Sequence, residues 1–152
     1  MKTLANVEDK AEIVRRLGTV GPESQRRWGK MDVAEMVCHL SDAMRVAMGE
    51  RPAGPKNIVL PRRVYKWIAL RTPTQWPHGV KTVPECEARV GGTAPAEFAR
   101  DLQEALGLLE RFSSASRDFA FAKHPIFGAM TDEEWMRWGW LHTDHHLRQF
   151  GA

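Results

Sequence analysis

Residues 131–150 read TDEEWMRWGWLHTDHHLRQF. Thr131 is followed three residues later by Glu134, which is the pattern of a capping box, in which two side chains satisfy free amides at a helix start. Met130 and Trp135 stand at the two positions of a hydrophobic staple across the same start. The segment therefore predicts a helix that begins at Thr131 and continues to the end of the segment.

This helix carries two histidines four residues apart. At about 100° per residue, His142 and His146 lie about 40° apart and one turn along, so they share a face. Two imidazoles placed in this way can bind one metal ion. The same face carries Trp135, Trp138 and Gln149, whereas Arg137, Trp140 and Asp144 face away from it. The pair is therefore expected to point into the protein.

A second helix is predicted from about Asp32 to Met48. Asp32 and Glu35 form another capping box, and Gly49 is the expected stop. The apolar stripe of this helix consists of Met36, Leu40, Ala43, Val46 and Ala47. His39 lies at the edge of that stripe, so it is also expected to face the core.

Two further helices follow from the same periodicity. Residues 7–17 have apolar side chains at helical spacing between Asn6 as N-cap and Gly18 as stop. Apolar residues recur in the same way from Pro95 to Phe112. A brief helix can open at Pro61, whereas residues 72–94 show no sustained period, which is typical of a functional or mobile loop.

The predicted fold class is all-α, because no alternating strand pattern and no internal repeat occurs. A chain of 152 residues falls in the size range of one domain, so residues 1–152 are expected to form a single four-helix bundle. The second and third main helices are separated by a connection of about 45 residues. A connection of that length can carry the chain back along the bundle and make these two helices parallel neighbours.

The axial positions of the three histidines allow them to meet. At 1.5 Å per residue, His39 lies about 10 Å from the N-terminal end of its helix, and His142 and His146 lie about 12 and 6 Å from the C-terminal end of theirs. Antiparallel packing of the two helices puts all three at one level. Three inward imidazoles without a thiolate suit a divalent transition metal, nickel or zinc, with open positions for catalysis. The alternative is three core histidines satisfied by hydrogen bonds.

Other histidines lie near this predicted site. His145 stands at the margin of the same helix face, where it could replace His146 as a ligand, act as a base, or be exposed. His78 lies in the long aperiodic segment and can reach the site only if that segment folds over it. His124 precedes Pro125 and is interpreted as a residue that organises a turn.

Three polar side chains near His39 also have alternative roles. Glu35 and Asp42 lie one turn before and after His39, where a carboxylate can orient an imidazole or simply be solvated. Cys38 lies about 100° from His39 on the helix and is interpreted as a buried apolar residue.

Composition excludes several classes of protein. Hydrophobic residues make up 43% and charged residues 27% of the chain, as in ordinary globular proteins. No window approaches the roughly 18 to 20 apolar residues of a membrane span, and acids occupy the start where a signal peptide needs an apolar run. Cys38 and Cys86 form no CxxC motif, so neither a disulfide framework nor a thiolate zinc site is predicted. A cytoplasmic protein is expected.

The positive net charge of +3 does not indicate a nucleic-acid site. Residues 1–76 carry 14 Lys and Arg against 8 Asp and Glu, and residues 77–152 carry 8 against 11. The excess is diffuse, and its densest groups belong to no motif that reads a groove of DNA. No nucleic-acid partner and no membrane partner is expected.

Two segments carry a resemblance to a known family. RWGKMDVAEMVCHL, residues 27–40, and HPIFGAMTDEEWMRWGWLHTDHHLRQF, residues 124–150, resemble the DinB-like superfamily, specifically a subgroup of unassigned function. The resemblance spans nearly the whole chain and is least clear over residues 50–94. It implies an up-down-down-up four-helix bundle with a metal bound by His39, His142 and His146. Characterised members include metal-dependent transferases and isomerases that use small thiols such as mycothiol or bacillithiol, and members often form homodimers.

These observations favour a metalloenzyme in which the ion activates a thiol or a water as nucleophile. Trp135 and Trp138 would provide apolar walls, the aperiodic segment 72–94 would cover the open end of the bundle, and His145 would move the proton. The expected partner is a small molecule, including a low-molecular-weight thiol. The alternatives are a non-catalytic metal-binding or stress-associated protein and a helical interaction module.

Overall fold

The computed structural model describes all 152 residues, and its regular structure is helical. Five α-helices and one short 3₁₀ helix follow one another as α1 (Val7–Leu17), α2 (Val33–Ala47), α3 (Arg62–Arg71), η1 (Pro84–Cys86), α4 (Phe98–Ser113) and α5 (Asp132–Gln149). There is no β-strand beyond two isolated bridges. The predicted all-α class is confirmed.

Local capping defines the start of α5, as the sequence predicts. The Thr131 hydroxyl accepts a hydrogen bond from the Glu134 amide at 3.2 Å, and the Glu134 carboxylate accepts from the Thr131 amide at 2.9 Å. Asp32 and Glu35 form the same reciprocal pair at the start of α2. Asn6 caps α1 by accepting from the amide of Asp9.

The start of α4 differs from the prediction. Apolar periodicity begins at Pro95, but the helix begins only at Phe98. The Glu97 carboxylate accepts from the amides of Ala99 and Arg100 and so acts as the N-cap. Glutamate is not a usual capping residue, so the sequence carries little signal for this boundary.

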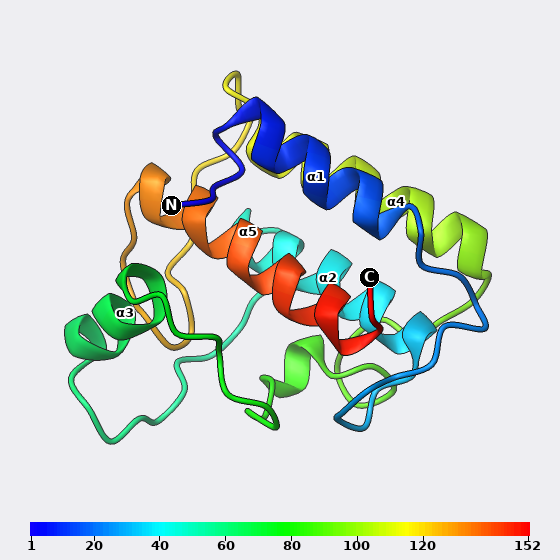
Figure 1. Cartoon of the computed structure of the whole chain (residues 1–152). Helices are drawn as coiled ribbons and strands as arrows, with labels where there is room; N and C mark the ends of the chain where they lie inside the picture. Colours follow the sequence, from blue (N-terminus) through cyan, green and yellow to red (C-terminus); the bar gives the residue numbers. More distant parts are fainter.

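The helices pack in two pairs that each run in one direction (Figure 1). Between α1 and α5, the indole of Trp140 donates to the Asp9 carbonyl, and one turn or more further along both helices Arg16 pairs with Asp144. These contacts show that α5 is covered on both faces: Trp140 and Asp144, expected to face away from the core, are buried beneath α1.

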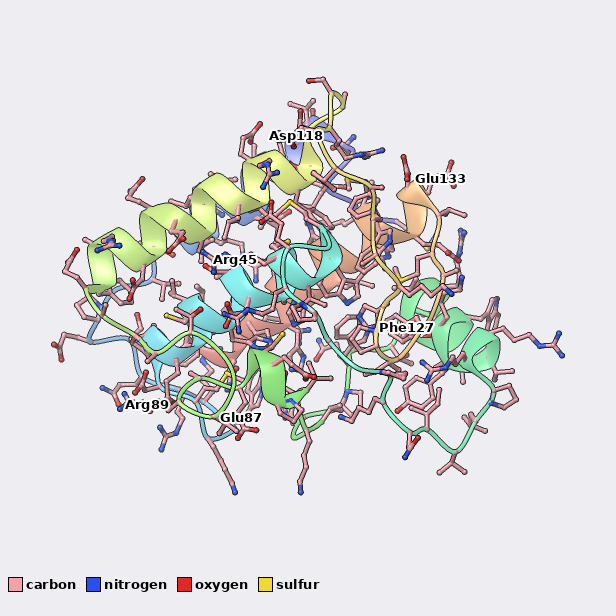
Figure 2. All side chains as sticks on the ribbon, turned by 180° about the vertical axis from the view of Figure 1, so that it is seen from behind. Arg45, Glu87, Arg89, Asp118, Phe127 and Glu133 are labelled. Atoms are coloured by element: carbon pink, nitrogen blue, oxygen red, sulfur yellow. The ribbon has the colours of Figure 1, made fainter.

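The second pair is α2 and α4, which pack along much of their lengths. The Cys38 thiol lies 3.9 Å from the Asp101 carboxylate, and further along both helices Arg45 pairs with Glu104. Figure 2 shows Arg45 between these two helices. Contacts that advance together along both helices show that α2 and α4 are parallel neighbours. In Figure 1 they run opposite to α5.

A close approach in the core requires glycine at position 139 of α5. A Cβ atom built on Gly139 would lie 2.7 Å from side-chain carbons of both Leu4 and Phe112. Both of these side chains are fully buried. Leu4, near the N-terminus, and Phe112, at the end of α4, therefore both pack against α5 at Gly139.

The connection between α2 and α4 folds over one side of the bundle and carries α3 and η1 (Figure 1). Asp42, which is completely buried on α2, accepts hydrogen bonds from the amide and the hydroxyl of Thr93 at 2.6 and 2.7 Å. Arg51 donates to the carbonyls of Glu85 and Gly91. These bonds fix η1 against α2. None of the helices has the length and apolar character needed to cross a membrane.

Candidate metal centre

Three histidines from two helices converge. His39 of α2 and His146 of α5 are 4% and 8% exposed, His142 of α5 is partly buried, and ligand atoms from all three lie within 4.8 Å of one another. The Nε2 atoms of His39 and His142 are 3.1 Å apart. The predicted convergence of these residues is confirmed.

Hydrogen bonds on the far side of two rings determine which nitrogen faces the centre. His39 Nδ1 lies 2.9 Å from the Cys86 carbonyl oxygen, which only accepts, so Nδ1 carries the hydrogen. His146 Nδ1 lies 2.9 Å from Oε1 of Gln149, whose amide nitrogen donates to the Trp28 carbonyl. In both rings Nδ1 is therefore the donor, and Nε2 keeps its lone pair.

The third ring is held differently. His142 stacks on Trp138 with ring centroids 4.8 Å apart and an angle of 15° between the planes. Its Nδ1 is buried and has no hydrogen-bond partner, while its Nε2 faces that of His39. Nε2 makes no hydrogen bond to a protein group other than His39.

This geometry fits a divalent metal ion. Two nitrogens bound to one ion at 2.0–2.1 Å in tetrahedral geometry are about 3.4 Å apart. The observed 3.1 Å between Nε2 of His39 and Nε2 of His142 is close to that spacing. Either Nε2–H of His142 donates to the lone pair of His39, or both nitrogens direct lone pairs at a cation between them, and the second arrangement is that of a metal site. The three residues can therefore hold a metal ion.

The electrostatics keep the imidazoles neutral, which is the form that binds metals. Burial lowers the pKa of His39, although the Cys86 carbonyl and the nearby Asp42 act against this. Burial also lowers the pKa values of His142 and His146 well below the usual value, and the charges of neighbouring histidines add to the effect. Protons therefore do not compete for these nitrogens at neutral pH.

His145, the predicted base, lies beside this group and not within it. Its ring centroid is 5.2 Å from that of His146, and its Nδ1 is buried without a hydrogen-bond partner. Burial, and then the charge of Arg148, lowers its pKa to about 4. His145 is thus a neutral, partly buried imidazole at neutral pH.

The aperiodic segment 72–94 lies over the histidines, as predicted. Trp76 donates to the Ala69 carbonyl, and its ring lies 6.3 Å from that of His142 and 6.2 Å from that of His145. His78 stacks on Trp28 at 4.0 Å with planes 8° apart. The segment therefore folds over the site, and the exposed His78 lies with its ring 6.2 Å from that of His145.

A cavity of about 400 Å³ opens beside the three histidines. Apolar side chains from α2, α3, α5 and the segment over the site line most of it, among them Val46, Ala47, Ile68, Trp76, Val83 and Trp138. His124 and His145 also line it, and Lys81 is the only lysine, arginine or acidic residue that does so. The cavity suits an uncharged, largely apolar molecule.

The flanking carboxylates have structural roles. Asp42 accepts from Thr93 and pairs with Arg45 and Arg51, so it neither bonds to the His39 ring nor points to solvent. Glu35 completes the capping box of α2. The Cys86 carbonyl was not predicted as the partner of His39, since a backbone oxygen has no sequence signature.

The remaining predictions concern one histidine and the two cysteines. His124 Nδ1 accepts from the amides of Ile126 and Phe127, which confirms its role in a turn. Its place in the cavity wall was not predicted. Cys38 and Cys86 are buried free thiols, and burial raises the pKa of each to about 12. Neither thiol is ionised at neutral pH.

Comparison with known proteins gives one match. No curated protein and no solved structure matches the chain. A family model described as "Protein of unknown function (DUF1569)" matches residues 2–152. The match covers both helices that carry the three histidines and the segment that folds over them. The chain therefore belongs to the DUF1569 family.

Proposed function

We propose that this chain is a metal-dependent enzyme in which His39, His142 and His146 hold one divalent ion, nickel or zinc. The observation that carries the proposal is the convergence of three neutral imidazoles beside an apolar cavity. Three protein ligands leave open positions on the ion, which is the form of a catalytic site. A structural site would use a fourth protein ligand, and neither buried cysteine belongs to the group.

We further propose that the architecture is the up-down-down-up bundle of the DinB-like superfamily. The parallel packing of α1 with α5 and of α2 with α4 supports this assignment, as does the long connection between α2 and α4 (Figure 1). The resemblance of residues 27–40 and 124–150 is a second, independent support.

A divalent ion bound here lowers the pKa of a thiol or a water that occupies an open position, and so supplies a nucleophile at neutral pH. The protein itself contributes a place for the proton. His145 lines the cavity and is neutral at neutral pH, so we assign it as the base that takes the proton.

The apolar walls hold the second reactant and exclude water. Trp138 stacks on His142, and Trp76 lies over the same ring, so an apolar electrophile in the cavity would lie beside the three imidazoles. With a chlorinated acceptor, a sulfur–carbon bond forms while the carbon–chlorine bond breaks. Chloride leaves with the electron pair, and the proton of the thiol passes to His145. Hydrolysis is the outcome when water takes the place of the thiol.

Turnover of the metal-loaded protein tests the proposal. A panel would combine low-molecular-weight thiols with chlorinated or epoxide acceptors, and His39→Ala would be measured beside Gln103→Ala, a control on the exposed side of α4. Slow turnover that His39→Ala abolishes and Gln103→Ala retains supports the proposal. Turnover that survives in His39→Ala overturns it.

The second candidate is a non-catalytic metal-binding protein. The segment that covers the three histidines is compatible with storage or sensing of a metal. Full metal occupancy without turnover anywhere in the panel would favour this candidate. A homodimer, which the resemblance implies for many members, stays a prediction that size-exclusion chromatography with light scattering tests.

A further inference from the structure

The turn at residues 124–128, HPIFG, is held by its own backbone hydrogen bonds and by Arg62. His124 and Gly128 exchange backbone hydrogen bonds of 2.9 and 2.8 Å, and Gly128 has a φ of +73°, which favours glycine. The guanidinium of Arg62 donates to the carbonyls of Pro125 and Ile126 at 2.6 and 2.8 Å. Figure 2 shows Phe127 of this turn beside α3. The turn is therefore a fixed platform.

This platform holds one imidazole in a single orientation and a single tautomer. His124 Nδ1 accepts hydrogen bonds of 3.1 Å from the amides of Ile126 and Phe127. An acceptor nitrogen carries a lone pair, so the hydrogen of the neutral ring is on Nε2. The ring also stacks on Phe127 at 4.4 Å with planes 14° apart. Burial, and then the charge of Arg62, lowers the pKa of His124 to about 3, so the ring stays neutral.

The N–H group at Nε2 of His124 has no partner in the protein. His124 lines the cavity, and Nε2 is not among the polar atoms that are sealed from solvent without a partner. A single indole separates it from the metal-binding group, since Trp138 lies 5.3 Å from the His124 ring and 4.8 Å from the His142 ring. One small molecule can therefore contact both.

Three other side chains of the same wall, Trp135, His142 and His145, carry a ring nitrogen without a hydrogen-bond partner. Each of these nitrogens is sealed from solvent, so a molecule in the cavity does not reach it. Nε2–H of His124 is not sealed in this way, and it can only donate. A ligand that matches this group must therefore supply an acceptor.

We propose that the cavity binds an uncharged, apolar molecule with a hydrogen-bond acceptor such as a carbonyl or ether oxygen, and that His124 Nε2–H holds this oxygen. The body of the molecule then lies along Trp138 toward the three imidazoles. The inference rests on the proposed function in so far as this molecule is the substrate. Its binding does not require the metal, so it can be tested separately.

Two probes of the same ring frame, 1-indanone and indane, differ in one carbonyl oxygen. Their binding to the full chain would be measured by calorimetry, with zinc bound and after its removal by a chelator. The variant His124→Asn retains an acceptor near the position of Nδ1 and lacks the donor at Nε2. It is expected to weaken 1-indanone binding about 2- to 10-fold, the value of one neutral hydrogen bond, and to leave indane binding unchanged.

A second measurement needs no variant. In ¹⁵N-labelled wild-type protein, the Nε2 resonance of His124 is expected to shift during titration with 1-indanone and to stay in place with indane. The proposal is overturned if the variant weakens both probes equally or neither, if Nε2 does not respond, or if neither probe binds. Metal content and turnover are measured independently of probe binding. Loss of the proposed enzymatic function can therefore be distinguished from the absence of this binding site.

Discussion

The Gln149 side chain accepts a hydrogen bond from Nδ1 of His146 at 2.9 Å, one turn along α5. Its amide group donates in turn to the carbonyl of Trp28 at 2.9 Å, in the segment that precedes α2. A single side chain therefore orients one of the three imidazoles and ties it to the part of the chain that leads to His39. Such outer hydrogen bonds fix the tautomer and direction of a metal-binding histidine.

Replacing Gln149 by Leu is expected to weaken zinc binding about 10- to 100-fold, because it removes this acceptor and lets the ring turn. Competition with a chromophoric chelator measures the affinity. Gln103→Leu makes the same chemical change at an exposed position of α4 and is expected to have no effect. Equal zinc affinities in the two variants would contradict the role assigned to Gln149.

Wild-type protein purified without an affinity tag is expected to contain about one divalent ion per chain, and His142→Ala is expected to lose it, because two imidazoles remain of three. Elemental analysis measures both. Thr131→Ala is the control, since it alters the start of α5 and leaves all three imidazoles in place. If His142→Ala retains as much metal as the wild type, the assignment of the site is wrong.

The helices of this chain were predictable where their boundaries depend on neighbouring residues. The capping boxes at Asp32 and Thr131 have a fixed spacing, and the structure contains both. At α4 the amide of Ala96 binds the Asp101 carboxylate and Glu97 caps the helix, which delays its start. That arrangement depends on a buried side chain beside Cys38 of α2, and periodicity within α4 does not reveal it.

The three histidines were predictable for a related reason, because helix geometry determines how far each lies from the end of its helix. The hydrogen-bond partners of these histidines were harder to predict from the sequence. Gln149 was placed on the correct face by its spacing from His146, but the Cys86 carbonyl arrives from the distant connection. Its position depends on the contacts of Asp42 with Thr93, which are separated by 51 residues and leave no local pattern.

Acid is expected to destabilise the metal-free protein, and His124 supplies one measurable part of this effect. Its pKa is about 3 in the folded chain against 6.5 for the ordinary side chain, so below pH 6.5 the unfolded chain binds a proton that the folded chain does not. Stability is therefore retained above pH 6.5 and lost as the pH falls. Between about pH 5.5 and 4, one such histidine contributes about 1.4 kcal/mol per pH unit to the slope.

The variant His124→Asn has no group to titrate at this position. The free energy of unfolding of both proteins would be measured in urea, without metal, between about pH 5.5 and 4. As the pH falls, the value for the variant is expected to decrease less steeply than that of the wild type, by about 1.4 kcal/mol per pH unit. The buried His39, His142 and His146 still titrate in both proteins and give the common part of the slope. Parallel pH profiles for the two proteins would show that His124 is not held neutral by its surroundings.

The last prediction separates the stability of α5 from the chemistry at its far end. Thr131→Ala removes the hydroxyl that accepts from the Glu134 amide, and the loss of such a cap costs about 0.5–2 kcal/mol. With a urea dependence of about 1–3 kcal/mol per M, the unfolding midpoint should fall by a few tenths of a molar unit or more. Thr131→Ser retains the hydroxyl and should stay close to the wild type. Both folded variants should bind the same amount of metal, because His142 and His146 lie three turns or more from the cap. A midpoint unchanged by Thr131→Ala would show that the cap does not stabilise α5.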